Sequence, residues 1–185
     1  MSAPGIPVSQ ARRQQIESLL WPSGAAGGSV WAVLDLARDR RIHAALLESR
    51  LEFLCLHAGR LPRELELAAP HIVELLPGHR LLDRLFGEGW GQSWGVAARL
   101  ADPTALRRHL RKFLKVRDED GRSLLFRWYD PRVLRTYLPT CTPDELREFF
   151  GPLDAWFSES AAGAAMVEHR FDGRVLRRRE VAVTA

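Results

Sequence analysis

The fold is decided by the stretch VWAVLDL at residues 30–36. In a β-strand, Trp31 and Val33 would face one side of the sheet, while Ala32 and Leu34 would face the other. Apolar side chains on both sides predict a strand that is covered on both of its faces. Asp35 then stands at the end of this apolar strand.

The residues that follow extend this strand into a larger sheet. Residues 39–50 have the spacing of an amphipathic helix, with Ile42, Leu46 and Leu47 predicted to face inward. Residues 52–56 are expected to form the next strand, which gives a strand–helix–strand unit in outline. Further strands and hairpin arms are predicted at residues 71–75, 92–100, 113–117, 123–128, 165–171 and 175–183.

Capping residues mark several helix ends. Asp102 and Asp130 each precede a proline that fits the first helical turn. Thr142 and Glu145 have the spacing of a capping box. Helices are predicted over 10–20 with Ser9 as the N-cap, over 81–86 with Gly87 as the C-cap, from 103 onward, over 131–137 and over 143–150. These elements predict an α+β (mixed α/β) fold with a central mixed β-sheet of about six to eight strands flanked by helices.

The 185 residues are enough for one domain with a small appendage. We expect an N-terminal helix and loop over 1–29 with disorder at 1–8, a core over 30–152, and a C-terminal β-hairpin extension over 153–185. The chain has no apolar run of transmembrane length, so no membrane association is expected. Because its first residues show no secretory signal pattern, the cytoplasm is the expected compartment.

The two cysteines predict neither a metal site nor a disulfide. Cys55 lies in an apolar run and is expected to be a buried thiol, and Cys141 lies in a loop before a helix. The chain has no Cys-x-x-Cys motif, and its six histidines are scattered, so no metal and no cofactor are expected.

The net charge of +4 comes almost entirely from arginine, since Lys112 and Lys115 are the only lysines. A basic chain suggests nucleic acid as a partner. Arginine, however, also pairs with carboxylates and stacks on aromatic rings, which suits protein partners equally well. The basic segment over 107–112 would lie on the outer face of a helix, either as a solvated face or as a docking surface for an acidic partner.

The sequence offers few candidates for catalysis. Ser93 lies in a Gly-x-Ser-x-Gly string at 91–95, but a nucleophile elbow needs a helix after the serine, and a strand is predicted there. Asp35 and Asp130 could form a pair of catalytic carboxylates, but a strand end and a helix cap explain them as well. We therefore predict that the chain is not an enzyme.

Aromatic and arginine residues gather in two motifs, WGQSWG at 90–95 and FRWYDPR at 126–132. Such residues are enriched where proteins recognise one another. Trp90 lies between two glycines. Its ring either packs into the core beneath a loop or is exposed and anchors a partner. Arg127 is expected on a strand and, if that face is covered, needs a carboxylate that Asp35 or Asp130 could supply.

The order of these motifs after the strand at 30–36 resembles a known family. That family is the domain of unknown function 4123 (DUF4123), whose members are effector adaptors or chaperones of bacterial type VI secretion. The resemblance covers roughly residues 30–152. It implies a non-enzymatic loader that binds a toxic effector and helps to mount it on the VgrG spike. Some members carry a larger C-terminal lobe, so the resemblance does not say which effector is bound.

We take the partner-binding candidates from the two motifs: Trp90, Trp94, Arg127, Tyr129, Asp130 and Arg132. On this hypothesis, Arg132→Glu and Trp94→Ala weaken complex formation while the fold stays intact. The alternatives are an arginine-rich nucleic-acid-binding domain, whose affinity would fall steeply with salt, and a serine hydrolase using Ser93.

Overall fold

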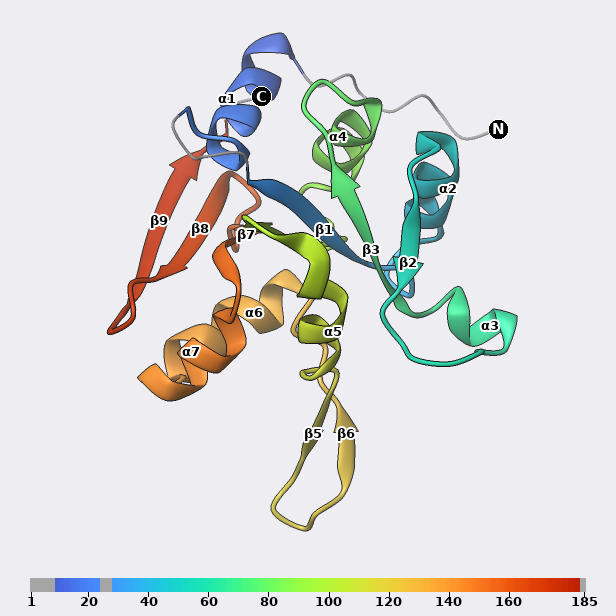
Figure 1. Cartoon of the computed structure of the whole chain (residues 1–185). Helices are drawn as coiled ribbons and strands as arrows, with labels where there is room; N and C mark the ends of the chain where they lie inside the picture. The colour runs from blue at the N-terminus through green and yellow to red at the C-terminus, as the bar shows by residue number, and fades with distance from the viewer. Residues whose placement is uncertain (1–8, 24–27, 184–185) are drawn as a thin grey trace.

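The computed structural model describes residues 9–23 and 28–183 (Figure 1). Seven strands form the central sheet in the order β2-β3-β1-β4-β7-β8-β9, and every neighbouring pair is antiparallel. Its strands are β1 (Ser29–Asp35), β2 (Phe53–Cys55), β3 (Pro70–Leu75), β4 (Gly95–Leu100), β7 (Leu153–Glu159), β8 (Ala165–Phe171) and β9 (Leu176–Ala182). The predicted α+β class is confirmed, and the number of strands lies in the predicted range. The expected mixed sheet is wrong, because every strand pairing in the central sheet is antiparallel. The disorder expected at residues 1–8 lies outside the described residues.

Strand β1 runs through the middle of the molecule. It pairs with β3 on one side and with β4 on the other, so that Val33 stands between Ile72 and Val96. The predicted unit of β1, α2 (Arg40–Ser49) and β2 is present, but β3 lies between its two strands. Because β3 is antiparallel to both of them, β1 and β2 run in the same direction but do not pair with each other.

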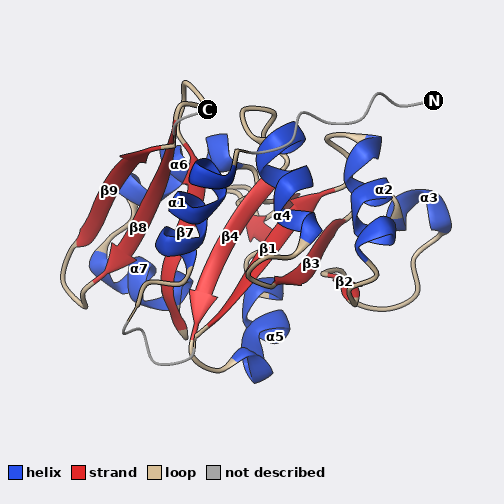
Figure 2. Cartoon of the chain, turned by 90° about the horizontal axis from the view of Figure 1, so that it is seen from above, coloured by secondary structure: helices blue, strands red, loops and turns tan. Residues whose placement is uncertain are grey.

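Helices cover both faces of the sheet (Figure 2). On one face lie α1 (Gln10–Leu20), α2 and α4 (Arg80–Arg84); on the other lie α5 (Leu106–Arg111), α6 (Pro131–Tyr137) and α7 (Pro143–Phe150). The short helix α3 (Arg63–Glu66) follows β2, and single 3₁₀ turns occur at Pro103–Ala105 and Leu138–Thr140. Each face has its own apolar cluster, which confirms that β1 is covered on both sides.

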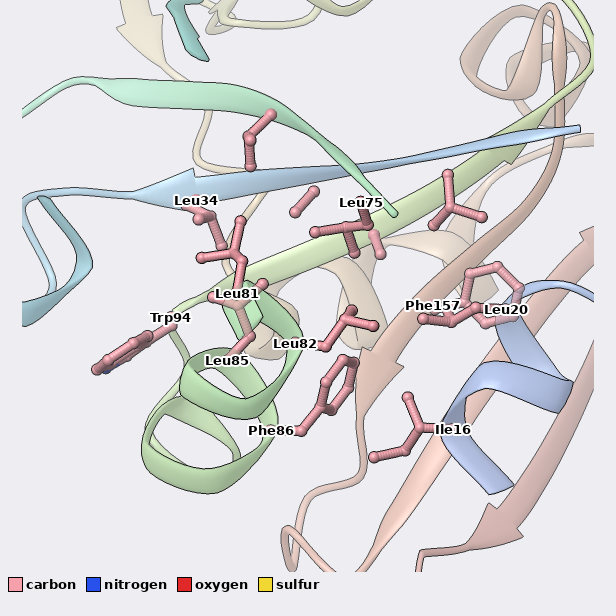
Figure 3. Close-up of a cluster of buried hydrophobic side chains, with 14 of the residues drawn as sticks. Ile16, Leu20, Leu34, Leu75, Leu81, Leu82, Leu85, Phe86, Trp94 and Phe157 are labelled. Atoms are coloured by element: carbon pink, nitrogen blue, oxygen red, sulfur yellow. The ribbon is translucent and has the colours of Figure 1, made fainter. Parts of the chain in front are cut away.

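The first cluster, which we call the α1 face, contains Ile16 and Leu20 of α1 beside Leu82 of α4 and Phe157 of β7 (Figure 3). The second cluster, the α7 face, is built around the rings of Trp128, Trp156 and Phe149, whose centroids lie 5.3–6.0 Å apart. Large aromatic rings in contact at these distances contribute a large share of the core's stability.

Two details of the predicted helices are wrong. Leu47 was expected to face inward, but it is 58% exposed. The buried face of α2 follows Ile42, Ala45, Leu46 and Ser49, and Leu47 lies about 100° around the helix from Leu46. Gly87 does not end the helix that begins at Arg80, because the chain continues as a π-helix over Leu85–Gly89.

Strand β4 begins at Gly95 and not at the predicted residue 92, because residues 90–93 form a turn. Two glycines allow the chain to pack tightly here. A Cβ on Gly95 would clash with the carbonyl oxygen of Val33, and one on Gly89 would lie 2.5 Å from the ring of Trp94. Both positions therefore need a residue without a side chain.

Residues 153–183 continue the central sheet. No strand was predicted over 153–159, but β7 lies between β4 and β8, with Phe157 opposite Ala97 and Trp156 opposite His169. The predicted hairpin of β8 and β9 is confirmed. Residues of this segment belong to both apolar clusters, together with residues of the preceding part of the chain.

The second predicted hairpin is also confirmed and projects from the body of the molecule (Figure 1). It consists of β5 (Lys115–Arg117) and β6 (Ser123–Leu125), with Gly121 at a positive φ of 77° in the turn. All residues of the two strands are exposed, including Val116 and Leu124.

Helix α1 is attached to the sheet by a buried arginine. The guanidinium of Arg99 in β4 donates to the carbonyls of Leu19 and Leu20 at 3.1 and 3.3 Å and pairs with Glu168 of β8 at 3.2 Å. A cation is favourable at this position because the free carbonyls at a helix C-terminus carry partial negative charge. Across residues 9–23 and 28–183, no helix has the length and apolar character needed to cross a bilayer.

His169 of β8 is a buried histidine on the α7 face. Neither of its ring nitrogens has a hydrogen-bond partner among the described residues. Burial, and then the charges of Arg178 and Arg135, lower the pKa of this imidazole from 6.5 to about 4. The folded protein therefore holds His169 neutral over a pH range in which the unfolded chain takes up a proton.

We predict that this histidine makes stability depend on pH. As the pH falls from 7 to 4.5, the unfolded chain binds the proton first, so His169 lowers the free energy of unfolding by about 2 kcal/mol. Urea denaturation across this range measures the loss. Burial also lowers the pKa of His71 and His109, so the control is His169→Phe, which keeps those two rings. Identical pH profiles for wild type and His169→Phe would contradict the prediction.

Candidate functional site

The two sequence motifs meet at one end of the sheet, where β1 and β7 end and β4 begins. The antiparallel register places Leu34 opposite Gly95, and the N–H of Asp35 donates to the carbonyl of Trp94 at 2.9 Å. The segment 126–132 reaches the same end after the β5–β6 hairpin. We call the charged residues gathered here the end cluster: Asp35, Arg38, Arg127, Asp130, Arg132, Arg135 and Glu159.

Asp35 is the most deeply buried acid of the end cluster, with 1% of its surface exposed. One carboxylate oxygen accepts the N–H of Ala37 at 3.2 Å, and the other pairs with the guanidinium of Arg127. The hydrogen bond to Asp35 raises the pKa of Arg127. Of the two acids considered for Arg127, the structure selects Asp35. Arg127 lies outside β6 and not on a strand as expected, and 43% of its side chain is exposed.

Tyr129 is buried beside this pair, with its ring edge-on to Trp128 at 5.6 Å. Burial, assisted by the nearby Asp35 carboxylate, raises the pKa of its phenol to about 12. The phenol is therefore neutral at physiological pH. A partner could reach Tyr129 only if the surrounding chain moved, so we assign it to the support of the site.

Asp130 caps helix α6 and orients Arg132. Its carboxylate accepts the backbone N–H of Arg132 at 2.9 Å and the guanidinium of Arg132 at 2.5 and 3.0 Å. Burial opposes the ionisation of Asp130, but these hydrogen bonds outweigh burial and hold the pKa of the carboxyl below its usual range. The carboxylate is buried, whereas the Arg132 side chain is 52% exposed. Asp130 thus presents an arginine whose position is already restricted.

Glu159, at the end of β7, is a site residue that the sequence analysis missed. Its buried carboxylate accepts the N–H of Gly91 at 2.6 Å, and the N–H and the hydroxyl of Ser93 at 3.1 Å each. Its own carbonyl accepts Arg135 of α6 at 2.6 Å. The sequence signal that could have identified Glu159 is an acid at the end of a strand, as at Asp35. The strand β7 itself, however, was not predicted.

Ser93 belongs to the turn that Glu159 closes. Its backbone has a positive φ of 58°, its hydroxyl donates to Glu159, and strand β4 follows it. A nucleophile elbow places its serine between a strand and a helix, so the string at 91–95 is a different structure. Arg38 closes the turn from outside by donating to the carbonyl of Gln92 at 2.9 Å.

The two tryptophans differ in their burial. Trp94 is 3% exposed; its indole N–H donates to Asp39 at 3.3 Å, and the guanidinium of Arg41 lies 5.4 Å from its ring centroid. Trp90 is half-buried and packs on Phe86 at 5.1 Å. Both rings line a small apolar pocket of about 50 Å³ on the α1 face. Trp94 is therefore a core residue, while Trp90 packs on the core and also keeps an exposed edge.

The basic segment at 107–112 has a use that neither interpretation of the sequence included. Arg107 donates to the carbonyl of Cys55 at 2.8 Å, and Arg111 donates to those of Leu56 and His57 at 2.6 and 2.7 Å. These bonds fasten α5 to the end of β2. Arg108 stays exposed.

Both cysteines are half-buried free thiols, and burial raises the pKa of each. Cys55 was expected to be fully buried, but it is only partly buried. Over the described part of the chain, no group of three or more His, Cys, Asp or Glu side chains is arranged to hold a metal ion.

A known protein family matches the region of the chain that contains both motifs. The family described as domain of unknown function (DUF4123) matches residues 30–148. The chain belongs to the DUF4123 family. No curated protein and no solved structure matches the chain.

The structure separates two members of the motifs that the sequence analysis treated alike. We predict that Trp94→Ala lowers the free energy of unfolding by about 3–5 kcal/mol, because it removes a large buried ring. Arg132→Gln should cost about 1 kcal/mol or less, because the arginine is half-exposed and its amide replacement still donates to Asp130. Urea denaturation at pH 7 measures both values. A loss for Arg132→Gln as large as that for Trp94→Ala would place Arg132 among the structural residues.

Proposed function

We propose that this protein is a non-catalytic adaptor of type VI secretion, which binds an effector in the cytoplasm of the producing bacterium and promotes its loading onto the VgrG spike. The observation that carries the proposal is membership of the DUF4123 family over residues 30–148. This range includes both WGQSWG at 90–95 and FRWYDPR at 126–132, the motifs on which the resemblance to secretion adaptors rests.

The geometry of the end cluster supports a role in recognition. Asp35, Asp130 and Glu159 are buried and bonded to neighbouring groups, while the side chains of Arg127 and Arg132 reach the surface from fixed positions. Side chains that are ordered before binding lose less conformational entropy when a partner arrives. A planar guanidinium also suits bidentate pairing with a partner's carboxylates.

The surface proposed to contact a partner consists of Trp90, Arg127 and Arg132, each partly exposed. Trp94, Tyr129 and Asp130 support it from below. This division narrows the six candidates taken from the sequence to three that a rigid partner could touch.

The two rival functions make different demands on the same residues. A hydrolase would need Ser93 accessible to a substrate and hydrogen-bonded to a base that is free to take its proton. Ser93 is instead 6% exposed, and the Glu159 carboxylate that accepts its hydroxyl also accepts two backbone N–H groups. A nucleic-acid binder would need many arginines free for phosphates, whereas several of them bond to acids or to backbone carbonyls. These contacts favour the adaptor over both rivals.

The proposal is tested by affinity purification of the tagged protein from its host, under conditions that express the secretion genes, followed by mass spectrometry. We expect the wild type and Ser93→Ala to recover a VgrG-type spike or a large toxin-like protein, and Arg132→Glu to recover less of it. Trp94→Ala is not used here because it is expected to destabilise the fold, so that a loss of capture would not report on the surface.

Two results would contradict the adaptor role. Recovery of nucleic acid, released by moderate salt, would favour the arginine-rich nucleic-acid binder. Ester cleavage that disappears in Ser93→Ala, with no protein partner recovered, would favour the hydrolase. Circular dichroism spectra of each variant verify that a loss of capture is not a loss of fold.

A further inference from the structure

Strand β9 is an open edge of the central sheet. It pairs with β8 along its whole length, and none of the residues in the described ranges forms a strand on its other side. Figures 1 and 2, which view the molecule from perpendicular directions, both show β9 as the outermost strand. Such an edge presents unpaired backbone donors and acceptors to which another chain can add a strand.

The hydrogen bonds at the two ends of the hairpin determine which backbone groups face outward. Asp172 donates to Val175 at the turn, and Val183 donates to Ala164 at the far end. In an antiparallel pair, hydrogen-bonded positions alternate with positions whose backbone groups point away. With Phe171 opposite Leu176, the outward groups are those of Leu176, Arg178, Glu180 and Ala182.

The bond from the side chain of Gln15 in α1 agrees with this assignment. It donates to the carbonyl of Ala182 at 2.5 Å, so that carbonyl points away from β8 and is already used. The open part of the edge therefore runs from Leu176 to Glu180. It offers a continuous row of outward N–H and C=O groups on three alternate residues.

The side chains along this open edge are strongly basic. Arg177, Arg178 and Arg179 follow one another and are all exposed. Arg177 pairs with Asp172 and Arg178 with Glu180, whereas Arg179 makes no ion pair with any residue of the described ranges. Glu180 is the single acidic residue of the strand, so the three arginines leave β9 with a net positive charge.

This charge pattern opposes pairing between two copies of the chain. A second β9 laid against the first in a central register would place arginine opposite arginine, and like charges directly opposite each other destabilise a pair of strands. An acidic strand in the same place would instead meet an arginine at each of these positions. The pattern therefore selects an occupant of opposite charge.

We propose that the open edge of β9 accepts an extended acidic segment of a protein partner as an eighth strand of the sheet. Backbone hydrogen bonds to Leu176, Arg178 and Glu180 would hold the segment, and Arg177 and Arg179 would select its carboxylates. This inference rests on the proposed function, because it gives the partner of the adaptor a recognisable feature. A simpler use of the arginines is to protect the edge against aggregation, and that use predicts no bound strand.

The test uses a blocked seven-residue peptide of alternating glutamate and valine, which matches the length of β9. Amide hydrogen exchange of the full chain is followed by NMR with and without this peptide. We expect the amides of Leu176, Arg178 and Glu180 to exchange rapidly in the free protein and to become protected when the peptide is added. The inward amides of Arg177 and Arg179 should be protected in both states.

Two variants separate backbone pairing from charge. Arg178→Pro removes an outward N–H and leaves the bonds to β8, since proline is tolerated where the N–H of an edge strand faces solvent. Arg178→Gln keeps that N–H and removes only the charge. We expect the proline variant to bind the peptide about tenfold more weakly than the glutamine variant. If Arg178→Pro fails to fold, N-methylation of the central valine of the peptide removes the matching bond from the other side.

Equal binding of a lysine–valine peptide, or peptide binding that protects none of the three outward amides, would overturn the proposal. So would the absence of any binding. Because no secretion protein takes part, these results leave the adaptor role untouched if a spike or toxin is still recovered from the host. Conversely, the protein could bind the acidic peptide in this way and recover no spike or toxin from the host. That result would support the edge site and contradict the proposed adaptor function.

Discussion

The carboxylate of Asp35, buried at the end of the central strand, requires a compensating charge, and much of the arrangement around it follows from that requirement. An unpaired charge in such a place is costly, whereas one that is paired and hydrogen-bonded is tolerated. The compensating charge comes from Arg127, far along the chain, after the projecting hairpin. This pair brings the segment 126–132 to the sheet end, where Asp130 starts α6 and presents Arg132. The buried carboxylate of Glu159 holds the turn at 90–93 at the same sheet end by accepting two of its backbone N–H groups.

The end cluster therefore contains three buried acids from separate parts of the chain. Asp35 and Asp130 pair with the exposed arginines Arg127 and Arg132, and Glu159 closes the turn at 90–93. Such an arrangement resembles the ordered polar surfaces through which proteins recognise partners, in which the groups are positioned before binding. The open edge of β9 is the second proposed surface and has different chemistry, since its backbone groups would bind a strand and its arginines would select charge. The proposed adaptor role requires the protein to hold an effector and a spike component together, and two separate surfaces would suit that role.

The sequence predicted best the features that depend on near neighbours. The N-caps at Ser9, Asp102 and Asp130, the capping box at Thr142 and both hairpins are formed by residues within a few positions of one another, and the structure contains each of them. The covered strand at 30–36 was predicted for the same reason, because its pattern is contained within the strand. The pairing of Arg127 was predicted only as a choice between two acids.

Features that depend on distant contacts were missed. Strand β7 follows Gly151 and Pro152 with a weak pattern, and only its place between β4 and β8 explains it. Glu159 could not be assigned without that strand. The insertion of β3 between β1 and β2, and the attachment of α5 to the carbonyls at 55–57, likewise depend on residues that meet only in the folded chain.

The central claim is that Asp35 and Arg127 act as one unit that holds the proposed recognition surface in place. A double-mutant cycle with Asp35→Asn, Arg127→Gln and the combined variant tests this directly, with the free energy of unfolding measured by urea denaturation. Because Arg127 is partly exposed, the account predicts a coupling energy of about 1–2 kcal/mol, with the double variant less destabilised than the sum of the single variants. Effects that add to within about 0.5 kcal/mol would show that the two side chains act independently, and would contradict the account.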